Sequence, residues 1–343
     1  MRFVDHFGLD IGSSSIKLVQ LAKIEDRFSL VTLGQVPTPI EIDESQKDWN
    51  TIPLTAVIKQ LVKDCRVTTR AVAVGLPESQ VYTRVVDLPV MNADELSQAI
   101  KFQIEQFVPL PAAEVIVKHT IITSQNPATG AMSVLLVACP NFLIDRYAKI
   151  VSESGLEMHS IDTESLSCAR ALIPFGTESP ITMIFDMGSG GSNFSLVKNG
   201  EIISTRSIGT GGKAISRAIA TDLGIEDKQA DEYRNSYGLN PNQLSGSVAK
   251  AMTPVVNLIV EEIKRVLVTI QNKNVADLPR RIVVFGGCAM IPGLVAYLAQ
   301  QLSVEVQLGN PFAVINRTND QVAAIGDSSA VFSNAVGLAM KEI

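Results

Sequence analysis

The chain has 343 residues, of which 46% are hydrophobic and 19% charged, so its composition excludes an intrinsically disordered protein and leaves room for about two domains. Its net charge of −6 argues against sequence-independent binding to nucleic acid or to an anionic membrane. No apolar run reaches the roughly 18 to 20 residues of a membrane helix, and the N-terminus lacks the zones of a signal peptide. Four cysteines stand singly without a CxxC pair, which argues against a zinc site and predicts a reduced, cytoplasmic setting.

Two segments half a chain apart share one pattern. In 9–21 (LDIGSSSIKLVQL) and in 185–197 (FDMGSGGSNFSLV), an aspartate between apolar residues precedes Gly-Ser, a turn of small residues and an alternation of apolar side chains. Such alternation is typical of half-buried strands. Asn199-Gly200 predicts a two-residue hairpin turn after the second copy. We expect each half to open with an antiparallel meander, and two such domains facing each other to form a cleft.

A separable α/β block is predicted between the two copies, over about 84–157. Asn92 followed by Glu95 predicts a capping box at the start of its first helix. The second half is predicted to be mostly helical over 213–271, before a strand that leads into a Gly-Gly turn and a helix. The strands and helices predicted in and beside the block cover 71–77, 81–89, 93–108, 132–140 and 142–153.

The two repeated turns are candidate phosphate loops. Phosphate binding needs backbone N–H groups close to anionic oxygens, and small residues permit this approach. One copy alone fits an ordinary hairpin turn capped by its aspartate, whereas two matched copies favour a phosphate site. Lys17 adds a point charge, and Asp10 and Asp186 at the strand ends are candidate magnesium residues. The loop residues are Gly12, Ser13, Ser14 and Ser15 in the first turn and Gly188, Ser189, Gly190 and Gly191 in the second.

Two weaker motifs follow in the second half. In GGCAMIPG (286–293), paired glycines after a buried strand allow a flat base to lie against the backbone, and Pro292 is expected to begin the next helix. Gly-Gly at a strand–helix junction is also common without a ligand. Asp231 and Arg234 lie three residues apart on one helix face, where they would contact a ribose and base or form an exposed ion pair.

These motifs resemble, in their order, those of the actin-like ATPase superfamily. The connecting segment SIDTESLSCARAL lies between the two turns, and the Gly-Gly turn follows them. Within that superfamily the chain most resembles the type IV pilus assembly protein PilM family, and more distantly FtsA. The resemblance runs nearly end to end through GLDIGSSSIK, LPVMNADELSQAIKFQIEQFVPLPAAEV, LLVACPNFLIDRYAKIVSESGLEMHSIDTESLSCARAL, RSIGTGGKAISRAI and FSNAVGLAMKEI.

The resemblance implies an α/β, actin-like ATPase fold, with two ribonuclease-H-like lobes around a nucleotide cleft and an inserted α/β subdomain in the first lobe. It implies ATP (or ADP) with magnesium in the cleft. A groove beside the first lobe would bind the cytoplasmic N-terminal peptide of the membrane protein PilN, at the inner face of the inner membrane among other pilus assembly proteins. The expected domains are 1–83 plus 158–180 and 325–343 (first lobe), 84–157 (inserted subdomain) and 181–324 (second lobe).

The resemblance also assigns nucleotide contacts residue by residue. Three positions depart from the family pattern: Asp231 and Arg234 replace a Glu-x-x-Lys pair, Lys213 stands where Asn is common, and Lys118 where an Asp is expected. The implied magnesium residues are Asp10 and Asp186. The implied nucleotide contacts are Gly12, Ser13, Ser14, Ser15, Lys17, Gly188, Ser189, Gly190, Gly211, Gly212, Lys213, Asp231, Arg234, Gly286, Gly287 and Met290.

Three classes of function stay open at this point. A true ATPase needs a side chain to orient the attacking water; Asp162 and Glu164 are candidates, although either also fits a cap of the helix over 166–172. A nucleotide-gated scaffold needs ATP to hold the lobes together without turnover, and we favour this reading, with slow or absent hydrolysis. An FtsA-like filament protein would carry a basic amphipathic tail; the sequence ends in GLAMKEI, so we expect membrane contact only through a partner, with self-association open. No motif points to a sugar or acetate kinase.

Overall fold

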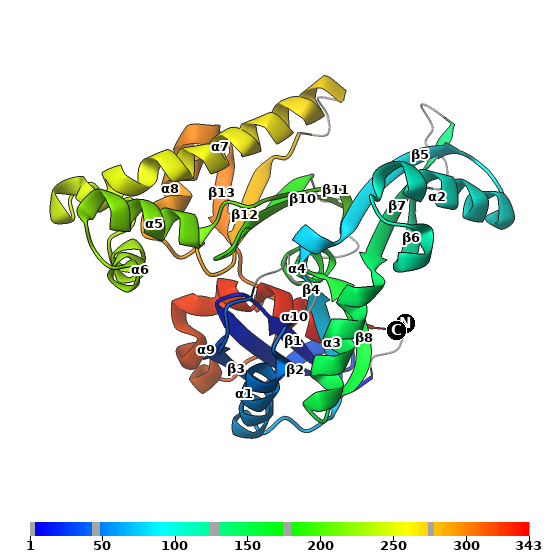
Figure 1. Cartoon of the computed structure of the whole chain (residues 1–343), viewed down its shortest axis with the longest axis horizontal. Helices are drawn as coiled ribbons and strands as arrows, with labels where there is room; N and C mark the ends of the chain where they lie inside the picture. The colour runs from blue at the N-terminus through cyan, green and yellow to red at the C-terminus, as the bar shows by residue number, and fades with distance from the viewer. Residues whose placement is uncertain (1–3, 43–48, 124–129, 174–179, 274–277, 343) are drawn as a thin grey trace.

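The computed structural model describes residues 4–42, 49–123, 130–173, 180–273 and 278–342. Three β-sheets organise these described residues, and Figure 1 shows them as a lower lobe, an upper lobe and a smaller block at the side. The strand orders are β3-β2-β1-β4-β8, β11-β10-β9-β12-β13 and β5-β7-β6. The strands are β1 (Phe7–Ile11), β2 (Ser15–Ile24), β3 (Arg27–Pro37), β4 (Ala71–Leu76), β5 (Tyr82–Pro89), β6 (Val115–Thr123), β7 (Ala131–Pro140), β8 (Glu157–Thr163), β9 (Thr182–Met187), β10 (Ser192–Lys198), β11 (Glu201–Ile208), β12 (Arg281–Phe285) and β13 (Glu305–Leu308).

The two five-stranded sheets repeat one topology. β1 pairs antiparallel with β2 and parallel with β4, which pairs parallel with β8. β9 likewise pairs antiparallel with β10 and parallel with β12, which pairs parallel with β13. The predicted meander at the start of each half is confirmed. Asn199 and Gly200 have φ values of 53° and 83°, the left-handed backbone that a two-residue hairpin turn requires.

Helices cover the sheets and join the lobes. α1 and α3 pack on the first sheet, and α5, α7 and α8 pack on the second. α4 and α10 lie against each other, between the two sheets in Figure 1. The helices are α1 (Thr51–Asp64), α2 (Ala93–Phe107), α3 (Asn141–Glu153), α4 (Glu164–Leu172), α5 (Gly212–Leu223), α6 (Asp227–Ser236), α7 (Ser247–Lys273), α8 (Leu294–Leu302), α9 (Asn319–Ile325) and α10 (Ser333–Ala339). Short 3-10 turns are η1 (Glu78–Gln80), η2 (Ala112–Glu114), η3 (Leu244–Gly246) and η5 (Gly326–Phe332).

Local signals at two helix starts have different outcomes. The capping box of α2 is confirmed: the Asn92 side chain accepts the N–H groups of Asp94 and Glu95, and the Glu95 carboxylate accepts the Asn92 N–H. The prediction that Pro292 begins a helix is wrong. α8 begins at Leu294 after Gly293, whose φ of 79° interrupts the helical backbone between Pro292 and the helix.

The inserted block, which we define as β5, β6, β7 and α2, has a hydrophobic core of its own. Residues of α2 such as Leu96 and Ile104 are buried against β7 residues such as Val134. α3 was expected in this block, within 84–157, but its Tyr147 and Leu143 are buried in the core of the first sheet. We therefore propose that the inserted block ends near the end of β7.

The boundary expected at residue 325, where the chain returns from the second lobe to the first, also differs from the observed packing. Phe312 and Ile315 lie within 181–324, the expected second lobe, yet they are buried in a cluster with Val19 and Leu30 of the first sheet and with α10. The Asn316 backbone bonds to Leu30 and Phe28. We propose that the chain returns to the first lobe before residue 312, earlier than 325.

One described helical stretch, 319–339, is long and apolar enough to cross a membrane by length and composition. More than half of its most apolar window is buried inside the fold, as in the core helix of a soluble protein, so the stretch is weak evidence for a membrane span. Its last part is α10, which packs against β1 and α4.

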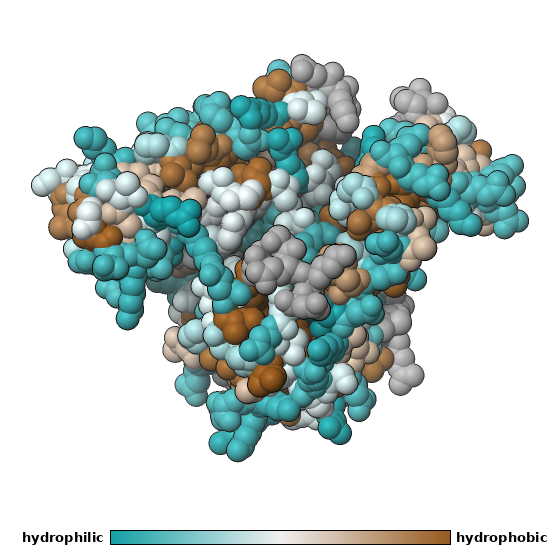
Figure 2. All heavy atoms as spheres, in the orientation of Figure 1, coloured by the Kyte–Doolittle hydropathy of each residue, from teal (hydrophilic) through white to brown (hydrophobic). Residues whose placement is uncertain are grey.

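The face in Figure 2 carries hydrophilic side chains over much of its area, including α6 and the far end of α2.

Candidate functional site

The two repeated turns face each other across a cleft between the lobes. The Gly12 N–H donates to the Ser15 carbonyl at 3.2 Å, and the Gly188 N–H donates to the Gly191 carbonyl at 3.0 Å, so both turns close in the same way. A Cβ placed on Gly190 would lie 3.7 Å from the Ser13 hydroxyl of the other turn. The turns thus form the floor of a cleft of about 1030 Å³.

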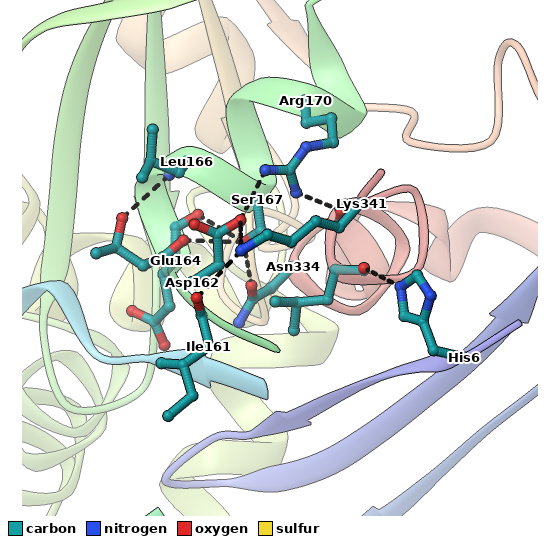
Figure 3. A network of polar contacts seen from close by, with 12 residues as sticks. His6, Ile161, Asp162, Glu164, Leu166, Ser167, Arg170, Asn334 and Lys341 are labelled. Atoms are coloured by element: carbon teal, nitrogen blue, oxygen red, sulfur yellow. Dashed lines mark hydrogen bonds and ion pairs between the residues drawn. The ribbon is translucent and has the colours of Figure 1, made fainter. Parts of the chain in front are cut away.

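Asp10 is the last residue but one of β1 and is held by two side chains. Lys17, its partner across β1 and β2, places Nζ 3.2 Å from Oδ2. The Asn334 amide of α10 donates to Oδ1 at 2.9 Å, and its carbonyl oxygen accepts a bond from the Ser167 hydroxyl of α4. Figure 3 shows Asn334 and Ser167 side by side between these two helices. The first turn is therefore tied directly to the helices that join the lobes.

Asp186 is the last residue but one of β9, the equivalent position, and lies opposite Asn193. Burial and the negative charge of Asp10 raise the pKa of Asp186 from 3.8 to about 7, although Lys17 and the Asn193 amide lower it in part. Gly286 lies beside this carboxylate with φ of 92°, and a Cβ there would lie 2.2 Å from Asp186 Oδ1. Only glycine fits this approach without a shift of the turn.

The cleft floor fits a nucleotide with a divalent cation. Within the described residues, the N–H groups of Ser13, Ser14, Ser189 and Gly190 make no hydrogen bond, so they are available to an anion. Asp10, Lys17 and Asp186 line the same cleft, and Lys17 pairs with Asp10 while its charge also acts on Asp186. No group of three or more His, Cys, Asp or Glu side chains that would hold a metal was found in the described chain. Two carboxylates suit magnesium, which keeps much of its water and also takes phosphate oxygens.

The predicted adenosine contacts separate into lining and supporting residues. Gly286, Gly287, Lys213 and Arg234 line the cleft. Arg234 also donates to the Gly212 carbonyl at 2.9 Å, so its guanidinium is fixed at the start of α5.

The remaining predicted contacts lie behind the lining or elsewhere. Gly211 packs under the second turn, where a Cβ would lie 2.6 Å from the Gly188 carbonyl oxygen. Gly212 donates its N–H to the same carbonyl at 3.0 Å. Asp231 holds Arg234 at 2.8 Å but is not among the described residues that line the cleft. Met290 packs against a hydrophobic cluster that includes Phe285 and Ala330, outside the cleft lining that the described residues form.

The two catalytic candidates have different surroundings. Asp162 is 8% exposed and forms ion pairs with Arg170 at 2.6 Å and Lys341 at 3.5 Å, as Figure 3 shows, and it is not among the described lining residues. Glu164 does line the cleft. Neither caps α4, because Thr163 is its N-cap and accepts the Leu166 N–H. Glu164 is therefore the candidate of the two that is placed to act on a ligand.

Sequence reasoning missed several cleft residues. Asn334 comes from the far end of the chain, and Trp49 and Tyr147 line the cleft from the first lobe. Glu41, after β3, reaches Lys213 of α5 at 2.8 Å and so links the two lobes across the cleft. The repeat offered one usable signal, since Asn193 occupies the position in the second copy that Lys17 occupies in the first.

A cleft between two lobes of the same topology, with an Asp-x-Gly-Ser turn from each, defines a protein with the actin-like ATPase fold. Solved structures agree. The PilM-PilN type IV pilus biogenesis complex matches with a TM-score of 0.84 and 22% identity over 98% of each chain. The ethanolamine utilization protein EutJ from Carboxydothermus hydrogenoformans matches with a TM-score of 0.61 and 16% identity, over 99% of this chain and 90% of that one. MreB5 of Spiroplasma citri bound to AMPPNP matches with a TM-score of 0.57 and 14% identity, over 98% and 95%.

Sequence comparison identifies the family. The family model "Type IV pilus assembly protein PilM" matches residues 8–343, and the chain belongs to this family. Curated relatives include the cell division protein FtsA of Bacillus subtilis, 20% identical over 94% of this chain and 82% of the relative. FtsA of Streptococcus pneumoniae is 21% identical over 89% of this chain and 75% of the relative.

Proposed function

We propose that this chain is an ATP-binding scaffold of the type IV pilus assembly machinery. The nucleotide that it binds changes its affinity for a membrane partner. The observation that carries the proposal is the pair of matched turns, which present unpaired N–H groups and two carboxylates to one cleft from two lobes. Its relative MreB5 is described with bound AMPPNP, which supports a nucleotide in a cleft of this fold.

Each lobe contributes its own contacts to the nucleotide. The phosphates lie between the two turns, where Lys17 and the free N–H groups bind their oxygens. Arg234 and the Gly286-Gly287 turn border the adenosine. Asp10 and Asp186 would hold magnesium, which would supply positive charge to offset the carboxylates and the phosphates. Because both lobes bind the same ligand, the nucleotide favours the closed arrangement by its differential affinity.

The proposed partner is the N-terminal cytoplasmic peptide of a PilN-like membrane protein. Support comes from the solved PilM-PilN complex, which matches this chain over 98% of its length. Through this partner, and among other inner-membrane assembly proteins, the chain would lie at the cytoplasmic face of the inner membrane without inserting into it. The inserted block beside the first lobe would form part of the peptide groove.

The nucleotide proposal is tested by isothermal titration of the purified chain with magnesium-ATP. Asp10→Ala removes one carboxylate, and Gly188→Val fills the second turn. Binding by the parent and loss in both variants is expected, with circular dichroism to verify folding. No binding by the folded parent would contradict the proposal. Glu105→Ala, an exposed position on α2, serves as the control that should bind normally.

Slow or absent hydrolysis remains part of the proposal. Glu164 is the cleft carboxylate available to orient water, and release of phosphate by the parent but not by Glu164→Gln would establish turnover. The FtsA relatives make a polymerising protein the alternative. Sedimentation of the same samples with and without magnesium-ATP distinguishes the two, because a filament pellets and a scaffold stays in solution.

A further inference from the structure

A cluster of unsatisfied polar atoms lies where the inserted block leaves the first lobe. Both carboxylate oxygens of Glu78, both polar atoms of the Gln80 amide and the Thr83 hydroxyl are buried without a hydrogen bond to any described residue. Leaving a buried polar atom unpaired is destabilising, and buried polar groups in folded proteins are nearly always paired. Five such atoms within six residues therefore mark a segment that a different packing would suit better.

This segment belongs to the cleft wall and to the inserted block at once. Pro77 and Ser79, on either side of Glu78, line the nucleotide cleft. The Glu78 N–H donates to the Glu164 carboxylate at 3.3 Å, so η1 also contacts the acid that we place nearest to a ligand. β5 begins at Tyr82, two residues after η1, and is an edge strand of the block. Only Val81 therefore separates this part of the cleft wall from the inserted block.

The Glu78 carboxyl lies where three parts of the molecule meet. It is 4% exposed. The hydroxyls of Ser165 of α4, Thr83 of β5 and Thr205 of β11 lie near enough to lower the pKa of Glu78 against the larger rise that burial causes, but none of them meets the distance and angle of a hydrogen bond to its carboxylate. Ser165 also bonds to Ser195 of β10 at 2.8 Å, across the two lobes. In Figure 1, β11 of the upper lobe runs toward β5, and the two strands are in contact.

We propose that η1, with Glu78 at its centre, couples closure of the nucleotide cleft to the position of the inserted block. The inference rests on the proposed nucleotide binding. A ligand in the cleft contacts the wall at Pro77 and Ser79 and draws Thr205 toward the first lobe with β11. The side chains of Glu78 and Gln80 then gain hydrogen-bond partners that they lack in this arrangement, and β5 moves with them. Packed elements with two alternative sets of contacts switch between arrangements and do not deform gradually.

The test is hydrogen–deuterium exchange of the full chain with and without magnesium-ATP, followed in peptides of β5, α2 and β6. The wild type is expected to change its exchange there when ATP binds. Glu78→Met keeps the length of the side chain and removes both orphan oxygens. This variant is expected to melt at a higher temperature, to bind ATP in calorimetry and to lose the change in exchange in the block. Glu105→Met, exposed on α2, is the matched control and should behave as the wild type.

Thr205→Val is the second variant, because it removes the hydroxyl that β11 offers to Glu78 while keeping the side-chain shape. It should also lose the change in exchange, and it carries the test if Glu78→Met does not fold. ATP binding by the wild type with unchanged exchange in the block, or a change that persists in both folded variants, overturns the coupling alone. Absence of ATP binding by the wild type in calorimetry overturns the proposed function and the coupling with it.

Discussion

The two Asp-x-Gly-Ser turns have nearly the same backbone but different surroundings. In the first turn, Asp10 has a cation from the neighbouring strand and an amide from α10. In the second, the strand neighbour is Asn193, and the pKa of Asp186 rises to about 7 because burial and Asp10 disfavour its charge. A repeated turn thus supplies one carboxylate that is already paired and one that gains most from an added cation. Lys17 and Asn193 occupy the same position in the two turns, and only the first carries a charge.

The largest difference between the lobes is expected from adding one methyl group beside Asp186 or beside Asn334, the amide partner of Asp10. In Gly286→Ala the Cβ meets the Asp186 carboxylate at 2.2 Å on a backbone with φ of 92°, whereas in Gly75→Ala it meets the Asn334 amide at 2.7 Å on a backbone without a positive φ. We expect Gly286→Ala to lower the free energy of unfolding by about 3 kcal/mol and Gly75→Ala by about 1 kcal/mol. Urea unfolding followed by circular dichroism measures both. Equal losses would mean that the two lobes tolerate the added group alike.

Neutralising each aspartate should change stability in opposite directions. Asp10→Asn leaves the mostly buried Lys17 cation with a weaker partner and should cost about 2 kcal/mol at pH 8. Asp186→Asn removes a carboxylate whose pKa is raised to about 7, and should stabilise the ligand-free protein by about 1 kcal/mol at pH 8.

The gain from Asp186→Asn depends on pH. In the wild type the folded state holds the Asp186 proton up to about pH 7, while the unfolded chain releases it near 3.8. The stability that this proton linkage provides is therefore lost as pH rises through that window. Melting temperatures of the variant and the wild type should differ at pH 8 and converge below pH 4. A constant difference across the range would contradict the raised pKa.

Exchanging the residue opposite the second aspartate should make the two turns more alike. Asn193→Lys places a cation across β9 and β10 from Asp186, as Lys17 does for Asp10. The pKa of Asp186 is expected to fall by about one unit, which corresponds to about 1.4 kcal/mol. A carboxyl-detected NMR titration follows it directly. Asn193→Gln is the control, because it keeps an amide and should leave the pKa raised.

The smallest expected effect concerns the contact that joins the lobes over the cleft. Lys213 and Glu41 pair at 2.8 Å, but both side chains are largely exposed, so Lys213→Met should change the free energy of unfolding by less than about 0.5 kcal/mol. The change should vanish in high salt, where exposed charges are screened. Lys264→Met breaks an exposed pair within α7 and is the matched control. A loss above 1 kcal/mol, roughly, would show that the pair holds the lobes closed.

Local chemistry made much of this molecule predictable. The Asn199-Gly200 turn and the capping box at Asn92 depend on residues within four positions of each other, and both are confirmed. The internal repeat predicted both meanders. The fold, in contrast, was predicted from the resemblance of the combined motifs to the actin-like ATPase superfamily.

Long-range packing explains what sequence reasoning missed. Nothing near Asn334 indicates that it contacts Asp10, which lies at the other end of the chain. The α3 pattern predicts a helix correctly, but not that its apolar face packs on the first sheet. Asp162 has a suitable side chain for water activation, yet Arg170 and Lys341 already pair with it. In each case the contact that determines the residue's role is made to another helix or strand.

The position of α10 has a consequence for synthesis on the ribosome. The core of the second lobe comes from one continuous stretch, residues 181–302. The first sheet, in contrast, needs α10, whose Ala335 carbonyl lies so close to β1 that a Cβ at Gly8 would approach it to 2.1 Å. Domains generally fold as units while the chain emerges. The second lobe therefore has its whole core once residue 302 is made, whereas one face of the first sheet, with Val19 and Leu30, stays without its cover until α10 follows.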